Sequence, residues 1–238
     1  MTGGSTMNRN LLFGLLALVA VSVFFMLSTE PSGDSEIAQT GSMTEASKQS
    51  SVGLITDERI INLESDEPGN WLSHGRTYEE TRFSPLTQIN KETVSQLGLA
   101  WYKDMGTNRA QESTPIIVDD IMYLTSSWSI VYAIDAKTGE TLWRYDPEVP
   151  GEHARKACCD VVNRGVAVYE GMVYVGSLDG RLIALNAESG DVIWEKDTII
   201  DRDRFYTITG APRVAKGKVF IGNGGAEFGV RGYVTAYN

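Results

Sequence analysis

Two stretches of the sequence repeat one another at an offset of 51 residues, and this repeat constrains the fold more than any other feature. Residues 114–143, TPIIVDDIMYLTSSWSIVYAIDAKTGETLW, resemble residues 164–194, RGVAVYEGMVYVGSLDGRLIALNAESGDVIW. Each stretch reads as three strands separated by turns, followed by a Thr/Ser-Gly turn and a terminal tryptophan. A period of this length is typical of stacked or radial units. Four-stranded blades around a central axis explain both the period and the tryptophans, whose apolar faces would join neighbouring blades.

A third unit begins at Gly210 and stops before its expected end. Ala236 follows Ala184 by 52 residues, so AYN at 236–238 matches ALN at 184–186, and the expected glycine and tryptophan do not follow. Propellers take about four to eight blades, so three units, the last incomplete, cannot close a ring. We therefore expect an all-β chain that is a fragment of a larger β-propeller.

The composition agrees with a folded, mainly β protein and argues against one class of partner. The chain is 42% hydrophobic and 22% charged, which is ordinary globular usage. Its 24 glycines and many tyrosine, valine and isoleucine residues favour short strands joined by tight turns. The net charge of −10 and the absence of a basic run argue against binding to nucleic acid, because nothing would displace the phosphate counterions.

The N-terminus has the pattern of an export signal. After Arg9, residues 11–27 carry no charge, and this run of 17 lies between a long signal-peptide core and a minimal membrane span. Residues 1–29 therefore predict a signal peptide or a membrane anchor. The anchor is preferred because no small-x-small cleavage site follows, and a buried core helix is the remaining alternative. Residues 30–55 are polar and predict a linker, which leaves 56–238 as the structured part.

The two cysteines of the chain, Cys158 and Cys159, are adjacent. Disulfides prefer Cα separations of about 4.4 to 6.8 Å, whereas neighbours across a trans peptide lie about 3.8 Å apart, so a bond between them closes a strained ring. The residues alone leave three interpretations open. They are two reduced buried thiols, a zinc site that includes His153, and a disulfide, which an oxidising compartment favours. Zinc is disfavoured because a structural site needs four ligands and the chain has 2 histidines.

Several segments together resemble the N-terminal third of pyrroloquinoline quinone (PQQ)-dependent alcohol dehydrogenases. The segments are GNWLSHGRTYEETRFSPLTQIN, QESTPI, ACCDVVNRGVAV, LDGRLIALNAESG, TITGAPRV and GNGGAEFGVRGYVTAY. The resemblance covers residues 56–238, and the adjacent cysteines followed by DVVNRG are its most specific part. It implies an eight-bladed β-propeller with tryptophan-docking repeats that holds PQQ and a metal ion, calcium or a lanthanide.

The resemblance also implies roles for five residues around the quinone. Cys158 and Cys159 would form a disulfide that lies flat against one face of the ring, and Arg164 would contact the quinone. Glu112 would form a hydrogen bond to PQQ, and Thr209 would donate one to a PQQ carboxylate. Taken singly, Glu112 is typical of an exposed strand residue, Arg164 of a charge at a strand start, and Thr209 of an ordinary strand threonine.

The stretch GNGGAEFG carries the remaining implied roles. The small residues Gly224, Gly225 and Ala226 would let the backbone N–H groups approach a carboxylate of the cofactor. Glu227 would bind the metal, which suits a hard, oxygen-seeking cation. Alone, the stretch also fits a hairpin turn with a surface acid, and a phosphate loop is disfavoured because no Gly-Lys-Ser/Thr follows. The family's catalytic aspartate and an asparagine ligand would lie beyond Asn238, so the fragment itself is expected to be inactive.

The function implied by the resemblance is oxidation of primary alcohols to aldehydes, with electrons passed to cytochrome c or another acceptor in the periplasm. Residues 11–27 would hold the protein at the inner membrane if they are retained, and a C-terminal domain with haem c is left open. A non-catalytic propeller that acts as an envelope scaffold for other proteins is the alternative from a different class. Membrane glucose dehydrogenases of related fold are a nearer rival, but by family pattern they lack the adjacent cysteines.

Overall fold

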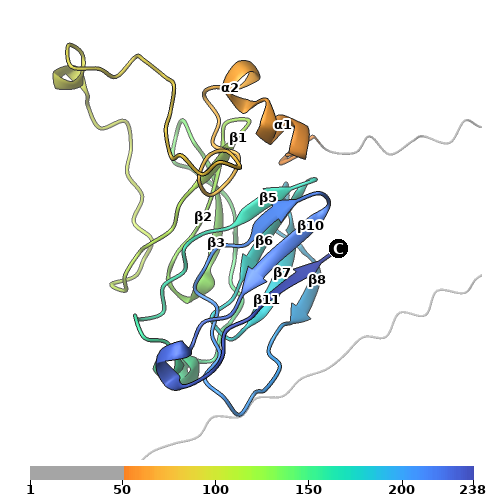
Figure 1. Ribbon diagram of the computed structural model, residues 1–238. Helices are drawn as coiled ribbons and strands as arrows, with labels where there is room; N and C mark the ends of the chain where they lie inside the picture. The colour runs from red at the N-terminus through yellow and green to blue at the C-terminus, as the bar shows by residue number, and fades with distance from the viewer. Residues whose placement is uncertain (1–50) are drawn as a thin grey trace, which may run out of the picture. The chain divides into compact units, whose positions relative to one another are not determined.

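The computed structural model describes residues 51–238 and is drawn in Figure 1. The expected leader at 1–29 and nearly all of the expected linker at 30–55 lie outside the described residues. Within residues 51–238, no helix is long and apolar enough to cross a membrane.

Three antiparallel sheets follow one another along the chain (Figure 1). The first blade is a four-stranded sheet made of β1 (Ile116–Val118), β2 (Ile121–Thr125), β3 (Val131–Asp135) and β4 (Thr141–Tyr145). The second blade has the same order and is made of β5 (Ala167–Tyr169), β6 (Met172–Gly176), β7 (Arg181–Asn186) and β8 (Val192–Asp197). The third blade has three strands, β9 (Arg213–Ala215), β10 (Lys218–Gly222) and β11 (Val234–Tyr237). The all-β prediction of two complete units and one incomplete unit is therefore confirmed.

The two complete blades share one register, which explains the recurring alanine and tryptophan. Ala133 pairs with Trp143 between β3 and β4, and Ala184 pairs with Trp194 between β7 and β8. In both blades the register shifts directly after the alanine. Such a bulge bends the strand and increases its twist. The sequence repeat thus encodes the shape of the outer half of each blade.

The recurring Asp/Asn and Gly positions build the turn between the last two strands. The Asp135 Oδ1 atom accepts a hydrogen bond from the Thr138 N–H at 2.8 Å, and the Asn186 Oδ1 atom accepts one from the Ser189 N–H at 3.0 Å. A side-chain oxygen of Asp or Asn that accepts from the backbone two or three residues on is the usual stabiliser of such a turn. The glycine that ends each turn has a φ of +78°, a conformation that glycine adopts without steric cost.

Tryptophan side chains dock each blade onto the next. The Trp143 Nε1 atom donates to the Ala187 carbonyl oxygen of the second blade at 3.0 Å, and its ring lies against Gly190. Trp101 makes the equivalent bond to the Ala136 carbonyl oxygen of the first blade at 3.1 Å. The docking role of the repeat tryptophan is therefore confirmed. The role of Trp101 was not predicted, because the segment before it does not show the repeat.

We expect Gly190→Ala to destabilise the protein through this docking contact. A Cβ atom at this position would lie 2.7 Å from the Trp143 ring, and the backbone φ is +78°. The strain of a left-handed backbone and the overpacking together predict a decrease of about 3 kcal/mol in the free energy of unfolding. Gly217→Ala is the matched control, because its φ is +69° but its Cβ atom would meet nothing within 4 Å. Strain alone predicts about 1 kcal/mol there. Equal losses in denaturant unfolding of the two full-length variants would contradict the docking argument.

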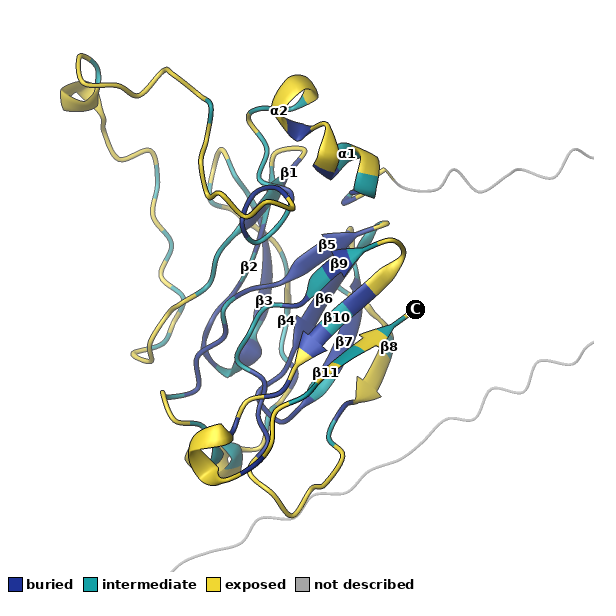
Figure 2. Ribbon diagram, viewed as in Figure 1, coloured by how far each residue is buried: buried dark blue, intermediate teal, exposed yellow. Residues whose placement is uncertain are grey.

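The apolar core lies between the blades, and the outer strands remain exposed (Figure 2). One cluster of buried side chains joins the N-terminal segment to the first two blades. A second cluster joins the second blade to the third, and includes Leu182, Ile208 and Ile221. In contrast, the fourth strands β4 and β8 are mostly exposed. Neighbouring blades therefore pack against both faces of the inner strands, and the same packing fixes the segments that lead into those strands.

The helices are short and lie outside the sheets. They are α1 (Asp57–Ile61), α2 (Leu63–Asp66) and the 3-10 helices η1 (Val94–Gln96), η2 (Ser127–Ser129), η3 (Gly151–Lys156) and η4 (Ala226–Phe228). Thr56 caps α1, since its side chain accepts from the Arg59 N–H. The packed structure begins slightly before the expected boundary at this threonine, because Ile55 is fully buried in the first cluster.

Candidate cofactor site

Three of the predicted site residues meet where the chain enters the first strands of the blades. The Arg164 Nη2 atom lies 3.0 Å from the Glu112 Oε2 atom, and its Nη1 atom donates to the Thr209 Oγ1 atom at 2.6 Å. The backbone joins the same segments, because the Arg164 N–H donates to the Thr209 carbonyl oxygen at 2.9 Å. The structure therefore brings one polar residue from each of three consecutive blades into a single cluster, which we call the arginine cluster (Glu112, Arg164, Thr209).

The arginine cluster remains open to a ligand. The Arg164 side chain is 41% exposed and that of Glu112 is 39% exposed. A guanidinium group carries five N–H donors, so the two contacts described leave donors for a further partner. A planar, permanently charged donor beside an accessible surface suits a ligand with carboxylate or carbonyl oxygens.

The glycine that follows the arginine is required by close backbone packing. Gly165 has a φ of +122°, and a Cβ atom there would lie 2.8 Å from the Thr114 carbonyl oxygen. Thr114 and Gly165 form a parallel bridge, and the Thr114 N–H donates to the Arg164 carbonyl oxygen at 3.2 Å. The Asn-Arg-Gly sequence thus allows the entry segments of two blades to touch directly.

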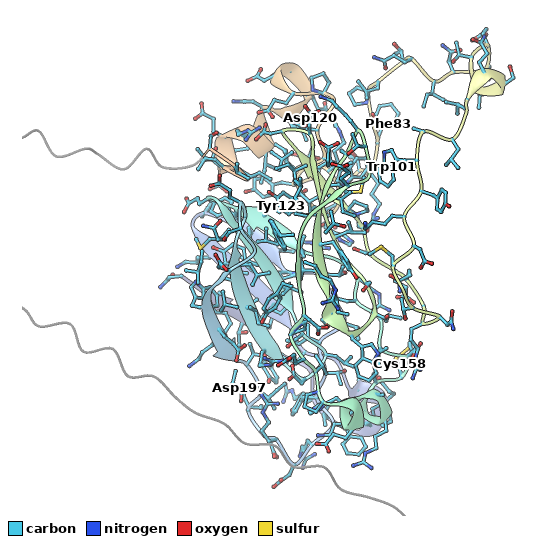
Figure 3. The ribbon with its side chains drawn as sticks, turned by 180° about the vertical axis from the view of Figure 1, so that it is seen from behind. Phe83, Trp101, Asp120, Tyr123, Cys158 and Asp197 are labelled. Atoms are coloured by element: carbon cyan, nitrogen blue, oxygen red, sulfur yellow. A yellow bond between two sulfur atoms is a disulfide. The ribbon has the colours of Figure 1, made fainter. Side chains whose placement is uncertain are left out.

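A disulfide joins Cys158 and Cys159 in the loop that follows η3, with a Cα–Cα distance of 3.8 Å. Both residues are exposed, and Figure 3 shows Cys158 near the end of the sheets opposite to Asp120. The buried-thiol interpretation is therefore wrong for this structure. The zinc interpretation has no support either, because residues 51–238 contain no cluster of three or more His, Cys, Asp or Glu side chains that could hold a metal ion.

An ion pair ties this cysteine loop to the segment that leads into the first blade. The Asp160 Oδ1 atom lies 2.6 Å from the Arg109 Nη1 atom. The pKa of the Asp160 carboxyl lies below its usual value, chiefly because the Val161 N–H donates to the carboxylate, with the Ala110 N–H and the Arg109 charge adding to the effect. The loop therefore keeps its anionic anchor at neutral pH.

The segment from Gly224 to Glu227 forms a tight loop before β11. The Gly224 N–H donates to the Thr207 carbonyl oxygen at 2.8 Å, which anchors the loop two residues before Thr209. Gly225 has a φ of +117°, and a Cβ atom there would lie 2.3 Å from the Phe205 carbonyl oxygen, so this position requires glycine. Gly224 is exposed, and the 3-10 helix η4 starts at Ala226. Glu227 is exposed and has no ion-pair partner in the described part of the chain.

Aromatic contacts join the cysteine loop to the Glu227 loop. The Lys156 Nζ atom lies 5.9 Å from the centre of the Phe205 ring, and the Phe205 and Phe228 rings pack edge to face at 5.5 Å. The disulfide and Glu227 make no hydrogen bond or ion pair with the arginine cluster within residues 51–238, but their loops are held together through these side chains.

Sequence reasoning assigned no role to Asn163, Arg109 or Asp160. Asn163 is 1% exposed and hydrogen bonded through its side chain, although it directly precedes Arg164 in the sequence. That adjacency is the only signal in the sequence, because an asparagine at a strand start normally predicts a turn. The ion pair of Arg109 and Asp160 spans 51 residues and has no local signature.

The docked four-stranded sheets define a β-propeller built from repeats, and comparison with known proteins gives its family. The family model described as PQQ, "Glucose/ethanol/alcohol dehydrogenase, beta-propeller domain", matches residues 71–238. The chain therefore belongs to the PQQ-dependent dehydrogenase propeller family. This match confirms the predicted β-propeller and the resemblance to quinoprotein alcohol dehydrogenases, and the number of blades in the whole ring stays a prediction.

Individual relatives agree with that assignment. The chain is 60% identical over 170 residues to the 1-butanol dehydrogenase (cytochrome c) of Thauera butanivorans, which covers 71% of this chain and 25% of the relative. It superposes on the quinohemoprotein alcohol dehydrogenase ADHIIG of Pseudomonas putida with a TM-score of 0.77 and 57% identity, covering 79% of this chain and 27% of that one. A europium-containing methanol dehydrogenase gives a TM-score of 0.71 and 43% identity, covering 76% of this chain and 32% of that one. The chain thus spans about a quarter of the length of the curated relatives it matches.

Proposed function

We propose that the full-length protein oxidises primary alcohols to aldehydes with PQQ and a bound metal ion. The observation that carries the proposal is the arginine cluster, in which Arg164 joins Glu112 and Thr209 at the entrances of three blades. A solvent-accessible guanidinium held by two partners is suited to a polyanionic planar ligand. The names of the similar proteins, alcohol dehydrogenases of the quinone class, support the same substrate class.

The residues present fit PQQ, a planar quinone that carries carboxylates. Arg164 has free N–H donors for a carboxylate or carbonyl oxygen, and Thr209 supplies a hydroxyl beside it. Within the described residues the backbone N–H groups of Gly225 and Ala226 donate no hydrogen bond, and Ala226 is exposed, so this loop would offer a backbone donor to a second carboxylate. The disulfide of Cys158 and Cys159 is exposed and would offer an apolar surface to the ring.

Each residue then has a defined task. When bound, PQQ would supply the redox chemistry by accepting hydride from the alcohol. Arg164 would orient the quinone and offset its negative charge, and Glu112 would keep the guanidinium in place. The disulfide would cover one face of the ring and exclude water from it. The base that takes the hydroxyl proton is expected from an aspartate beyond Asn238.

Glu227 would contribute an oxygen ligand to a hard cation, calcium or a lanthanide, whose positive charge would polarise a carbonyl oxygen. Calcium takes about six to eight oxygen ligands, so the others must come from outside this carboxylate. A europium-containing methanol dehydrogenase of 43% identity supports a lanthanide as the alternative to calcium at this site.

The electron acceptor and the location belong to the same proposal. We infer that electrons pass to a c-type cytochrome, because a relative with 60% identity is named for that acceptor. The name quinohemoprotein in another relative supports a haem-bearing C-terminal domain. Residues 11–27 would act as an export signal or as an anchor in the inner membrane, so that the propeller lies in the periplasm.

The proposal is tested with the full-length protein, reconstituted with PQQ and either calcium or a lanthanide. We expect ethanol-dependent reduction of an artificial electron-acceptor dye that needs both the quinone and the metal. A folded full-length protein that binds no PQQ and reduces no dye with any primary alcohol would favour the non-catalytic scaffold instead.

A further inference from the structure

Asn163 is a buried polar side chain with every hydrogen-bonding group satisfied. It is 1% exposed, and its Nδ2 atom donates to the Ser129 Oγ atom at 3.1 Å and to the Gly176 carbonyl oxygen at 2.8 Å. Its Oδ1 atom accepts from the Gly165 N–H at 3.0 Å. The amide therefore connects three places: the first blade, the strand β6 of the second blade, and the residue that follows Arg164.

The backbone of Asn163 belongs to a second set of hydrogen bonds that leads toward Glu112. Its carbonyl oxygen accepts from the Thr125 Oγ1 atom at 3.3 Å, and that hydroxyl lies 3.2 Å from the Ser113 Oγ atom. Ser113 directly follows Glu112 and also accepts from the Thr125 N–H at 2.9 Å. One partly buried network thus includes Asn163 and Ser113, which are the sequence neighbours of Arg164 and Glu112.

The acceptor of the amide lies in a strained turn of the first blade. Trp128 and Ser129 have φ values of +65° and +60°, which are unusual for residues other than glycine. The turn is tied to the second blade because the Trp128 N–H donates to the Val161 carbonyl oxygen at 2.8 Å, and the Ser129 Oγ atom also accepts from the Leu178 N–H at 3.1 Å. Strain of this kind persists only where the surroundings hold it in place.

We propose that Asn163 is a positioning residue for the quinone site, acting on Arg164 through the flanking backbone, an inference that rests on the proposed function. The amide fixes Gly165 on one side of Arg164, and its own backbone is fixed on the other. With the backbone fixed on both sides, the Arg164 side chain extends toward Glu112 and Thr209.

Loss of the amide would release this arrangement without touching the cofactor surface. In Asn163→Ala, the Ser129 hydroxyl, the Gly176 carbonyl oxygen and the Gly165 N–H would each lose a buried partner. Buried groups left unpaired drive rearrangement because their desolvation is no longer compensated. The segment that carries Arg164 would shift to reach water or new partners, and a displacement near 1 Å is enough to weaken a preorganised site.

The test measures PQQ binding to cofactor-free full-length protein by quenching of intrinsic fluorescence, at a temperature well below unfolding. We expect Asn163→Ala to raise the dissociation constant for PQQ by about tenfold, as for a site displaced by a fraction of an ångström. Asn186→Ala is the matched control, because its amide oxygen caps a turn of the second blade at 2.9 and 3.0 Å from the Glu188 and Ser189 nitrogen atoms. It should lower the melting temperature and leave PQQ binding unchanged.

Ser129→Ala provides a second, milder variant in case Asn163→Ala does not fold. It removes one partner of the amide and should raise the dissociation constant for PQQ by about threefold. The variant that combines both substitutions should have the same dissociation constant as Asn163→Ala alone, since the effects of coupled residues are not additive. Unchanged PQQ affinity in both single variants would overturn the inference, and so would an equal loss in Asn186→Ala. Failure of the wild-type protein to bind PQQ would instead overturn the proposed function on which the inference rests.

Discussion

Full-length protein that carries Glu227→Gln is expected to lose metal-dependent alcohol oxidation by about a thousandfold while remaining folded, since a charged ligand of the metal is worth several kcal/mol. The substitution keeps the size of the side chain and removes its charge. The loop should keep its shape, because Gly224 and Gly225 are set by backbone contacts that do not involve this carboxylate. Dye reduction with ethanol and metal content per protein are the two measurements.

The matched control for this variant is Glu188→Gln, an exposed acid on a turn of the second blade. It should change neither the activity nor the metal content. If Glu227→Gln retained the activity and the metal requirement of the wild type, the metal would have other ligands and the assignment of Glu227 would be wrong.

Arg164→Ala is expected to weaken PQQ binding by about a hundredfold, because hydrogen bonds to charged groups each contribute about 1.5 to 3 kcal/mol. The variant would also leave the carboxylate of Glu112, now 3.0 Å from the guanidinium, facing an anionic ligand without its counter-charge. The dissociation constant of Arg164→Lys for PQQ should lie between those of the wild type and Arg164→Ala, since an ammonium keeps the charge and loses the planar fork. The readout is the dissociation constant for PQQ of cofactor-free protein.

Arg144→Ala is the control for this series. Arg144 forms a surface ion pair with Asp146 at 2.7 Å on the outer strand β4, and such pairs contribute little to stability. Its removal should leave PQQ binding as in the wild type. A similar loss of affinity in Arg144→Ala would mean that net charge, rather than the arginine cluster, governs binding of the quinone.

The sequence predicts the blades well because each recurring residue stabilises a strand pair or a turn formed by residues close to it in the chain. Ala184 and Trp194 are paired across adjacent strands, and the asparagine and glycine between them build the turn. Short-range rules for strands, turns and glycine are sufficient for such features. In contrast, Trp101 docks onto the first blade from a segment with no repeat, and the burial of Ile55 depends on residues far along the chain.

The site is less visible in the sequence because its members come from different blades. Glu112 and Arg164 lie 52 residues apart, close to the blade period, and this spacing alone could have indicated equivalent positions at two strand entrances. The contact between Arg164 and Thr209 was not predicted, because the family resemblance implied only separate contacts of the two residues with PQQ. The sequence marks Asn163 only by its position next to Arg164, since its importance lies in burial and in three hydrogen-bond partners that local sequence does not reveal.

The most direct test of the quinone site is a crystal structure of the full-length protein with PQQ bound. We expect a quinone whose ring lies against the Cys158–Cys159 disulfide, with an oxygen atom within hydrogen-bond distance of the Arg164 guanidinium and a metal ion at Glu227. A quinone bound elsewhere on the propeller, with Glu112, Arg164 and Thr209 facing only solvent, would contradict it.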